Sequence, residues 1–357
     1  MISDLVRPEL KGFVPYKSKN MPYRVKLDAN ESPFGLPEGI RRRIADYFQN
    51  GAELNIYPDS DSVKLRDTLA KYWKVDPEGI VTGTGSNELI KNIINVFVQK
   101  GERIVLPSPS FEMYSLNSIM SGGIPVEVVL RCENGFKYDT DEFIDAVIRQ
   151  KAKMVFLCNP NNPTGNLISN PDIEKIAGSC SNSVIVVDEA YAEFSGQSAV
   201  PLVTRYSNIV VLRSFSKAYG LAGVRCGYSI SSREMANEIN KIKAPFNLNS
   251  LTQFIACLVF EEREEAERRI KYLCDQRDYL FSELSGINGV TAYPSEANFI
   301  LIKLPDAPGI TMELAKRGVL VRGFEKNPLL RDYIRVNTGT REQNEIFINE
   351  LKAILSA

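Results

Sequence analysis

One lysine in this chain lies among side chains that suit covalent chemistry beside a phosphate group. Ser214 and Ser216 precede Lys217 in the run Ser-Phe-Ser-Lys, and Arg225 follows a short distance on. A lysine amine forms a Schiff base with a carbonyl group, while hydroxyls and a guanidinium bind phosphate oxygens well. Most lysines are simply surface charges, so the neighbouring hydroxyls and the arginine are what single out Lys217.

Two other segments carry groups that a pyridine ring would need. Asp188 follows the apolar run 184–187, where a shielded carboxylate can keep a ring nitrogen protonated and make the ring an electron sink. A strand-end aspartate that caps the next turn is an equally good interpretation of that position. Tyr191 and Asn162 are candidates to hydrogen-bond a phenolic oxygen of the ring, although the Asn-Asn-Pro-Thr-Gly sequence around Asn162 is also typical of a turn.

A glycine-rich segment offers a second wall for the phosphate. Gly85, Ser86 and Asn87 come just before the helix-like stretch 89–98, so free backbone N–H groups at the helix start can face an anion. A helix cap with a glycine turn is the simpler alternative, because the segment lacks the lysine of a Walker P-loop. Phe111 follows a strand-like run and is a candidate to stack on a pyridine ring, although a core aromatic is nearly as common there.

Two arginines near the C-terminus are candidates to bind an anionic substrate. Arg322 and Arg335 both lie in strand-like runs, and a guanidinium binds carboxylate or phosphate with two parallel hydrogen bonds. Surface ion pairing is the alternative, and it fits Arg335 less well because its flanks are apolar. Together with Lys217 and Asp188, these residues predict an enzyme that uses pyridoxal 5'-phosphate (PLP).

The composition excludes several other kinds of chemistry. The 357 residues include 43 basic and 44 acidic side chains, so the net charge of -1 gives no general attraction to nucleic acid or membranes. Histidine is absent, which removes every histidine-dependent triad, and the six cysteines form no CxxC pair, so we expect no metal site. No run approaches the ~20 apolar residues of a membrane span, and the N-terminus lacks a signal-peptide pattern, so we expect a cytoplasmic protein.

Short β-branched runs alternate with helical stretches from about residue 80 onward. The runs lie at residues 103–106, 125–130, 153–157, 184–187 and 209–212. This alternation predicts an α/β fold with a mainly parallel sheet, and the candidate residues follow the carboxyl ends of its strands, where ligands gather. Later runs at 298–302 and 333–337 predict a smaller α/β domain. We therefore expect an N-terminal arm (1–37), a large PLP-binding domain (38–245) and a small C-terminal domain (246–357).

Landmarks along nearly the whole chain resemble the fold-type I PLP-dependent aminotransferases, and within that group the histidinol-phosphate aminotransferases. They lie at residues 27–35 (Leu-Asp-Ala-Asn-Glu-Ser-Pro-Phe-Gly), 57–59, 85–88, 158–165, 188–191 and 214–220, with Arg225 and Arg335. The resemblance implies a large domain with a seven-stranded, mainly parallel sheet flanked by helices. Asn87 and Phe111 depart from that branch, which often has Asp and Tyr at these positions, and the departure bears on the substrate more than on the superfamily.

The resemblance also implies roles for particular residues. Lys217 would carry PLP and Asp188 would pair with the ring nitrogen, while Tyr191 and Asn162 would contact the phenolic oxygen. The phosphate would be held by Gly85, Ser86, Ser214, Ser216, Arg225 and a Tyr57 that reaches across from the second subunit of a homodimer with shared active sites. For the substrate, Asn30 and Asn298 would line the pocket and Arg335 would take the anionic group.

The implied reaction is amino transfer between L-histidinol phosphate and 2-oxoglutarate in histidine biosynthesis, giving imidazole acetol phosphate and glutamate. An aromatic amino acid aminotransferase uses nearly the same parts. A PLP lyase resembling threonine-phosphate decarboxylase is a third possibility, because the motifs do not report which substrate bond stands perpendicular to the ring. A DNA-binding regulator built on the same fold is disfavoured by the near-neutral charge.

Overall fold

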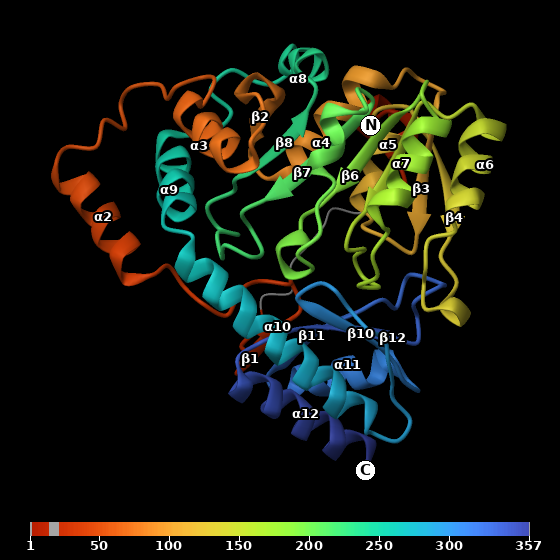
Figure 1. Cartoon of the computed structure of the whole chain (residues 1–357). Coiled ribbons are helices and arrows are strands. Elements are labelled where there is room, and N and C mark those ends of the chain that lie inside the picture. Colours follow the sequence, from red (N-terminus) through yellow and green to blue (C-terminus); the bar gives the residue numbers. More distant parts are fainter. Residues whose placement is uncertain (1, 14–20, 357) are drawn as a thin grey trace.

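The computed structural model describes residues 2–13 and 21–356, which form a large and a small α/β layer structure, each built around its own sheet (Figure 1). The large sheet has seven strands in the order β2-β8-β7-β6-β5-β3-β4. Its strands are β2 (Ile80–Gly83), β3 (Arg103–Ser108), β4 (Ile124–Val129), β5 (Met154–Cys158), β6 (Val184–Asp188), β7 (Ile209–Ser214) and β8 (Gly227–Ser231). All five strand-like runs predicted between residues 103 and 212 are thereby confirmed.

Strand direction in this sheet follows the prediction of a mainly parallel arrangement. The pairs β3·β4, β3·β5, β5·β6 and β6·β7 are parallel, and only β8 runs antiparallel to its neighbours β2 and β7. The central strands are buried along their whole length, because helices cover both faces of the sheet. Such strands read as continuous apolar runs, which is why they were recognisable in the sequence.

Alternate residues of the central strands supply two separate cores. Ile185 and Val187 belong to the core on one face, whereas Val186 and Val210 belong to the core on the other. Helices α3, α6, α7 and α9 contribute to the first core, and α4, α5 and α8 contribute to the second. The helices of this part are α2 (Glu38–Gln49), α3 (Val63–Trp73), α4 (Ser86–Phe97), α5 (Met113–Met120), α6 (Thr140–Gln150), α7 (Asn170–Ser179), α8 (Arg233–Asn240) and α9 (Ser250–Glu261).

The smaller sheet has five strands in the order β1-β11-β12-β10-β9. Its first strand comes from the N-terminal part of the chain and pairs in parallel with β11, so it lies beside strands from the other end of the sequence. The strands are β1 (Val25–Leu27), β9 (Thr291–Ala292), β10 (Phe299–Lys303), β11 (Val319–Gly323) and β12 (Tyr333–Asn337). The strands expected near residues 298–302 and 333–337 are confirmed, while the bounds of the three expected segments stay a prediction.

Three long helices complete the small part. They are α10 (Glu264–Ser285), α11 (Ala307–Lys316) and α12 (Arg341–Leu355), and their apolar faces pack with β10, β11 and β12 in one core. The remaining helical segments are short: α1 (Ile2–Leu5) and the 3-10 turns η1 (Pro8–Leu10), η2 (Pro77–Gly79), η3 (Cys132–Asn134), η4 (Ala192–Phe194) and η5 (Val200–Thr204). Within the described residues, no helix is both long and apolar enough to cross a membrane.

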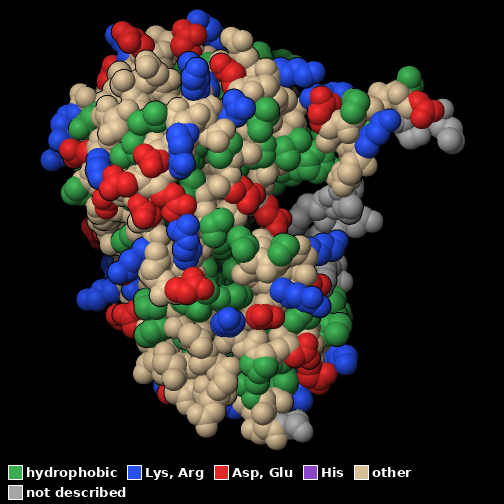
Figure 2. All heavy atoms as spheres, turned by 90° about the vertical axis from the view of Figure 1, so that its right-hand side faces the viewer, with side chains coloured by type: hydrophobic (Ala, Val, Ile, Leu, Met, Phe, Trp, Pro, Cys, Tyr) green, Lys and Arg blue, Asp and Glu red, His purple; other side chains and the backbone are tan. Residues whose placement is uncertain are grey.

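A small apolar cluster joins the two parts of the molecule. It brings Tyr191 and Ala218, which follow strands of the large sheet, into contact with Leu273 of α10 and Phe299 of β10. On the face shown in Figure 2, basic and acidic side chains are interspersed over both parts, with no large area of one sign. Binding of an anion on this face must therefore depend on local groups.

Candidate active site

Two adjacent parallel strands deliver the central candidate residues to one edge of the large sheet. Strand β6 ends at Asp188 and β7 ends at Ser214, and Asp188 lies opposite Leu212 in the ladder. Tyr191 follows the first strand and Lys217 follows the second. Since carboxyl ends of parallel strands open at the same edge, the predicted grouping of these side chains follows from the topology.

The amine of Lys217 lies in a mostly shielded position between the two parts of the molecule. Its Nζ donates a hydrogen bond of 2.8 Å to the backbone carbonyl of Ala29 and lies 5.9 Å from the centre of the Tyr191 ring. Burial, followed by the positive charge of Arg335, lowers the pKa of Lys217 to about 8. A lysine with such a pKa is partly neutral near physiological pH and can act as a nucleophile.

Asn30 fastens the N-terminal segment over this lysine. It adopts a left-handed conformation with φ of 54°, its side-chain amide donates to the Tyr191 hydroxyl at 3.0 Å, and its N–H donates to Asn337 at 3.2 Å. The amide of Asn298 donates in turn to the carbonyl of Asn30 at 3.1 Å. The Oδ1 atoms of Asn30 and Asn298 are buried without a hydrogen-bond partner among the described residues, so each can accept from a bound ligand.

Arg335 brings a positive charge into the same space. One guanidinium nitrogen donates to the side-chain oxygen of Asn162 at 2.6 Å, and another donates to the carbonyl of Asp28 at 2.7 Å. Arg322 lies directly opposite Arg335 in the β11·β12 ladder, so both side chains leave the same face of the small sheet. Two like charges on adjacent strands repel, and an anion bound between them would relieve that repulsion.

The predicted phosphate ligands also come together. The guanidinium of Arg225 donates to Ser216 Oγ at 3.4 Å, and the Ser216 N–H donates to Ser214 Oγ at 3.1 Å. Gly85 has a φ of 76°, and a Cβ atom at this position would lie 2.5 Å from Nη2 of Arg225. Helix α4 begins at Ser86, so its N-terminal N–H groups open beside this arginine.

Three predicted cofactor residues lie at the margins of this group. Asn87 is exposed in the first turn of α4, and Phe111 is half-buried before α5. Tyr57 is 78% exposed and stacks on Phe246, with ring centres 4.5 Å apart. Its role across a subunit boundary stays a prediction.

Asp188 is held by a partner that the sequence did not point to. Its Oδ2 accepts a hydrogen bond of 2.7 Å from the hydroxyl of Tyr114, and its Oδ1 accepts one of 3.1 Å from the N–H of Ala190. Burial raises the pKa of Asp188 to about 6, against the effect of these hydrogen bonds. Tyr114 had no signal of its own in the sequence, since an aromatic three residues after Phe111 reads as helix core.

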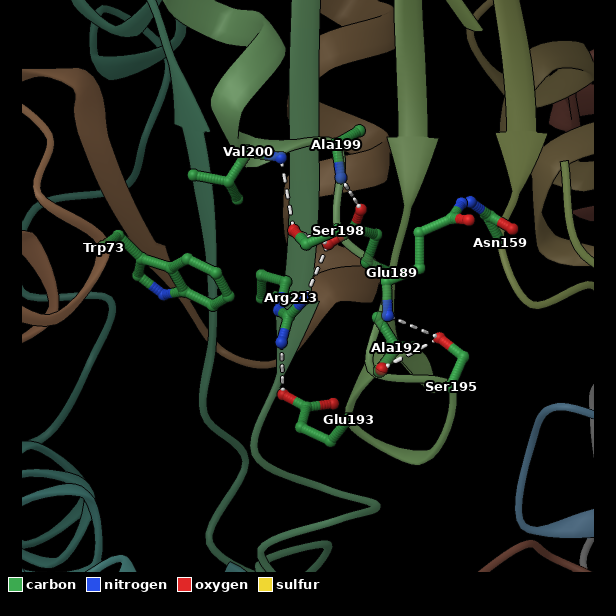
Figure 3. Close-up of polar contacts among 12 residues, drawn as sticks. Trp73, Asn159, Glu189, Ala192, Glu193, Ser195, Ser198, Ala199, Val200 and Arg213 are labelled. Atoms are coloured by element: carbon green, nitrogen blue, oxygen red, sulfur yellow. Dashed lines mark hydrogen bonds and ion pairs between the residues drawn. The ribbon is translucent and has the colours of Figure 1, made fainter. Parts of the chain in front are cut away.

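A buried ion-pair group supports the site from the other side of β7. Arg213 contacts Glu189 at 2.5 Å and Glu193 at 2.7 Å, and its guanidinium lies 4.6 Å from the centre of the Trp73 ring (Figure 3). Glu189 follows Asp188 directly, and Arg213 directly precedes Ser214. The group therefore ties the turn after β6 to the end of β7. In the sequence, charged residues inside apolar runs could have indicated this ion-pair group, because charged residues are buried only when they are paired.

These side chains match what a phosphorylated aromatic aldehyde requires of a protein. Lys217 supplies a nucleophilic amine and Asp188 supplies a shielded carboxylate. The segment around Arg225 supplies hydrogen-bond donors for an anion. Asn30 and Asn298 retain buried acceptor atoms that the described residues do not use. The arrangement thus fits a PLP-type cofactor together with an anionic substrate.

Comparison with known proteins agrees with this chemistry. The chain belongs to the aminotransferase class I and II family, whose sequence profile matches residues 23–351. The expectation of a fold-type I aminotransferase is thereby confirmed.

Three relatives illustrate how closely the chain follows one branch of the family. The histidinol-phosphate aminotransferase of Ruminiclostridium cellulolyticum is 46% identical to it over 354 residues, which cover 99% of each protein. The solved histidinol-phosphate aminotransferase from Clostridium acetobutylicum superposes with a TM-score of 0.85 at 25% identity, covering 93% of this chain and 99% of the other. The enzyme from Sinorhizobium meliloti, solved in complex with pyridoxal-5'-phosphate, gives a TM-score of 0.88 at 22% identity and covers 98% and 97%.

Proposed function

We propose that this protein catalyses PLP-dependent amino transfer between L-histidinol phosphate and 2-oxoglutarate, giving imidazole acetol phosphate and glutamate in histidine biosynthesis. The observation that carries the proposal is the 46% identity, over 99% of both chains, to a histidinol-phosphate aminotransferase. The convergence of Lys217, Asp188 and Arg335 at one edge of the large sheet supports it.

The cofactor part of the proposal assigns one task to each group. Lys217 would bind PLP through its amine, and Asp188 would hold a proton on the ring nitrogen. Phe111 supports the ring, and Tyr191 and Asn162 contact its phenolic oxygen. Phosphate is bound by Gly85, Ser86, Asn87, Ser214, Ser216, Arg225 and the partner's Tyr57. When bound in this way, PLP supplies the electron sink for the carbon from which a proton is removed.

The catalytic work of the chain is then proton movement by Lys217. Its neutral Nζ would take a proton from the amine-bearing carbon of the substrate and would later give that proton up again, acting first as a base and then as an acid. The lowered pKa of Lys217, about 8, supports this role because a base works best when its pKa is near the working pH.

Substrate recognition is proposed to rest on the two facing arginines. L-histidinol phosphate has a phosphate and no carboxylate, whereas glutamate has two carboxylates, so one site must accept different anions. Arg335 and Arg322 emerge from one face of the small sheet, and a guanidinium binds either anion with paired hydrogen bonds. Asn30 and Asn298, with their unused acceptor atoms, would line the rest of the pocket.

We further propose that the enzyme is a cytoplasmic homodimer with shared active sites. Apolar side chains are exposed on and after α2, at the margin of the molecule in Figure 1. They include Phe48 at 45%, Leu54 at 57%, Ile56 at 58% and Tyr57 at 78% exposure. Apolar side chains gathered in this way favour a protein interface.

The first test is the visible absorption spectrum of the PLP-loaded protein before and after addition of L-histidinol phosphate without any keto acid. We expect the band of the lysine-linked cofactor to convert to that of the pyridoxamine form. An unchanged spectrum, with conversion by phenylalanine or tyrosine instead, would identify an aromatic amino acid aminotransferase. Release of carbon dioxide without a keto-acid requirement would identify a lyase like threonine-phosphate decarboxylase.

A further inference from the structure

We propose that Tyr114 is a positioning residue that acts through Asp188: its hydroxyl keeps the carboxylate charged and oriented, so that the proton stays on the ring nitrogen of bound PLP. The inference rests on the proposed cofactor role of Asp188 and adds a residue to which neither the sequence motifs nor the resemblance assigned a task.

Tyr114 is fixed in place by its surroundings. Its side chain is 1% exposed and its ring stacks on Phe156, with centres 4.6 Å apart and planes 19° apart. Phe111 meets the same ring edge-on at 5.6 Å, and the hydroxyl of Ser118 donates to the Tyr114 carbonyl. A ring held on two sides has little freedom to rotate, so the direction of its hydroxyl is set by packing.

The hydrogen bond itself joins two buried groups. Asp188 is 3% exposed and accepts from Tyr114 through Oδ2 at 2.7 Å. Ala190 donates its N–H to Oδ1 at 3.1 Å. An ionised carboxylate has about four acceptor positions, so these two donors leave capacity for a third on a bound ring. Tyr114 thereby fixes one edge of the carboxylate while the other can serve the cofactor.

The energetic effect of this hydrogen bond has a definite sign. A donor to an ionised carboxylate stabilises the charged form and lowers its pKa, whereas burial raises it. Burial and the charge of Asp188 raise the pKa of Tyr114 well above its ordinary value, so the hydroxyl keeps its proton and remains a donor. Without the hydroxyl, the proton would reside more often on Asp188 and less often on the ring nitrogen of bound PLP. The ring would then be a weaker electron sink.

The other ionisable groups whose pKa is coupled to the charge of Asp188 come from several elements, and none of them is a positively charged partner. Glu189, next in the chain, raises the pKa of Asp188. The charge of Asp188 in turn raises the pKa of Cys158 at the end of β5, of Tyr138 before α6 and of Tyr191. Glu189 opposes the charge on Asp188, while its own contact is to Arg213. Tyr114 is thus a principal source of stabilisation for the carboxylate in the protein without cofactor.

The test is Tyr114→Phe, which keeps the stacked ring and removes only the hydroxyl. In protein without cofactor, carboxyl-labelled aspartate followed by carbon-13 NMR should show the pKa of Asp188 raised by about one unit. In protein loaded with PLP labelled at the ring nitrogen, nitrogen-15 NMR should show that nitrogen less protonated. Exchange of the substrate carbon-bound hydrogen should slow by roughly tenfold, with substrate KM unchanged.

Tyr138→Phe is the matched control. Its hydroxyl donates to the carbonyl of Cys158 at 2.9 Å, close to the same strand end, without contacting Asp188. This variant should leave both NMR readouts as in the unmodified protein. An unchanged Asp188 pKa in Tyr114→Phe, or equal shifts in both variants, would overturn the proposal. The carboxylate titration needs no substrate, so a wrong assignment of L-histidinol phosphate would leave this result readable on its own.

Discussion

At the scale of single residues, the working parts of the site are set by desolvation more than by contact with opposite charges. Lys217 lies against a backbone carbonyl, and Asp188 accepts from a tyrosine and a backbone N–H. Burial is the largest cause of both pKa changes, which bring the lysine to about 8 and the aspartate to about 6. A lysine whose pKa is close to neutrality suits proton transfer near neutral pH, while an aspartate with a pKa of about 6 remains mostly ionised there.

The lysine should therefore capture the cofactor in a pH-dependent way. Only the neutral amine attacks an aldehyde, and each unit of pH below the pKa of Lys217 reduces its neutral fraction about tenfold. We expect the rate of appearance of the visible band, on mixing cofactor-free protein with PLP, to rise with pH and level off above a midpoint of about 8. Lys217→Ala should form no such band. A midpoint above 10, as for an exposed lysine, would contradict the assignment.

Loss of Arg335 should separate substrate binding from cofactor binding. Arg335→Ala removes the guanidinium that reaches Asn162 and that we propose binds the anionic group, so the KM for both the amino donor and the keto acid should rise by roughly one to two orders of magnitude. PLP affinity should change little. If both KM values stayed as before, steady-state kinetics of Arg322→Ala would show whether Arg322 holds the anion instead.

The sequence was informative about residues wherever a motif combined several unusual groups in one short segment. Lys217 with its serines, and Asp188 after a continuous apolar run, were recognisable for that reason. Tyr114 and the carbonyl of Ala29 were not, because their roles come from contacts between segments far apart in the chain. A tyrosine that binds Asp188 and one that only fills a core have the same local pattern.

At the scale of secondary-structure elements, β7 carries functional groups on one side and structural ones on the other. Ser214 belongs to the proposed phosphate ligands, while Arg213 points to the ion-pair group with Glu189 and Glu193 (Figure 3). The alternation along a strand makes this division possible. The position of the strand could be predicted from the sequence. The ion-pair partners of Arg213 could not, because they depend on how the neighbouring turn folds.

Removing the charge of Arg213 should strongly destabilise the fold. Arg213→Met would leave two buried carboxylates without their positive partner, and we expect the free energy of unfolding to fall by about 3–5 kcal/mol in denaturant titrations. The matched control is Arg42→Met, which removes an exposed pair with Glu38 and should cost less than about 1 kcal/mol. Equal effects of the two substitutions would show that the buried group does not hold the turn.

At the scale of the whole molecule, the site lies where the two sheets meet. Residues from the large sheet, the small sheet and the N-terminal segment contact one another through Tyr191, Asn30 and Asn298. The seven-stranded sheet could be expected from the alternation of runs and from resemblance. The place of residues 25–27 in the small sheet could not, because a three-residue strand carries almost no periodic signal.

Shared active sites can be tested by mixing two defective variants. In a heterodimer of Lys217→Ala and Tyr57→Ala, one site receives both substitutions and the other receives neither. Random exchange of subunits should therefore restore about a quarter of the unmodified activity at limiting PLP, because half of the dimers are mixed and each has one intact site. Lys217→Ala re-mixed with itself serves as the control. No recovery, with subunit exchange confirmed by sedimentation, would show that each chain forms its site alone.

The pairing of β1 with β11 also has a consequence for how the protein is made. Residues 25–27 need residues 319–321 as their strand partner, and Asn30, just beyond them, needs Asn337. During synthesis the early segment has to wait until nearly the whole polypeptide has left the ribosome. The chain can therefore build its large sheet while it is still being translated, but it completes the surroundings of Lys217 only at the end, so truncated products lack a complete site.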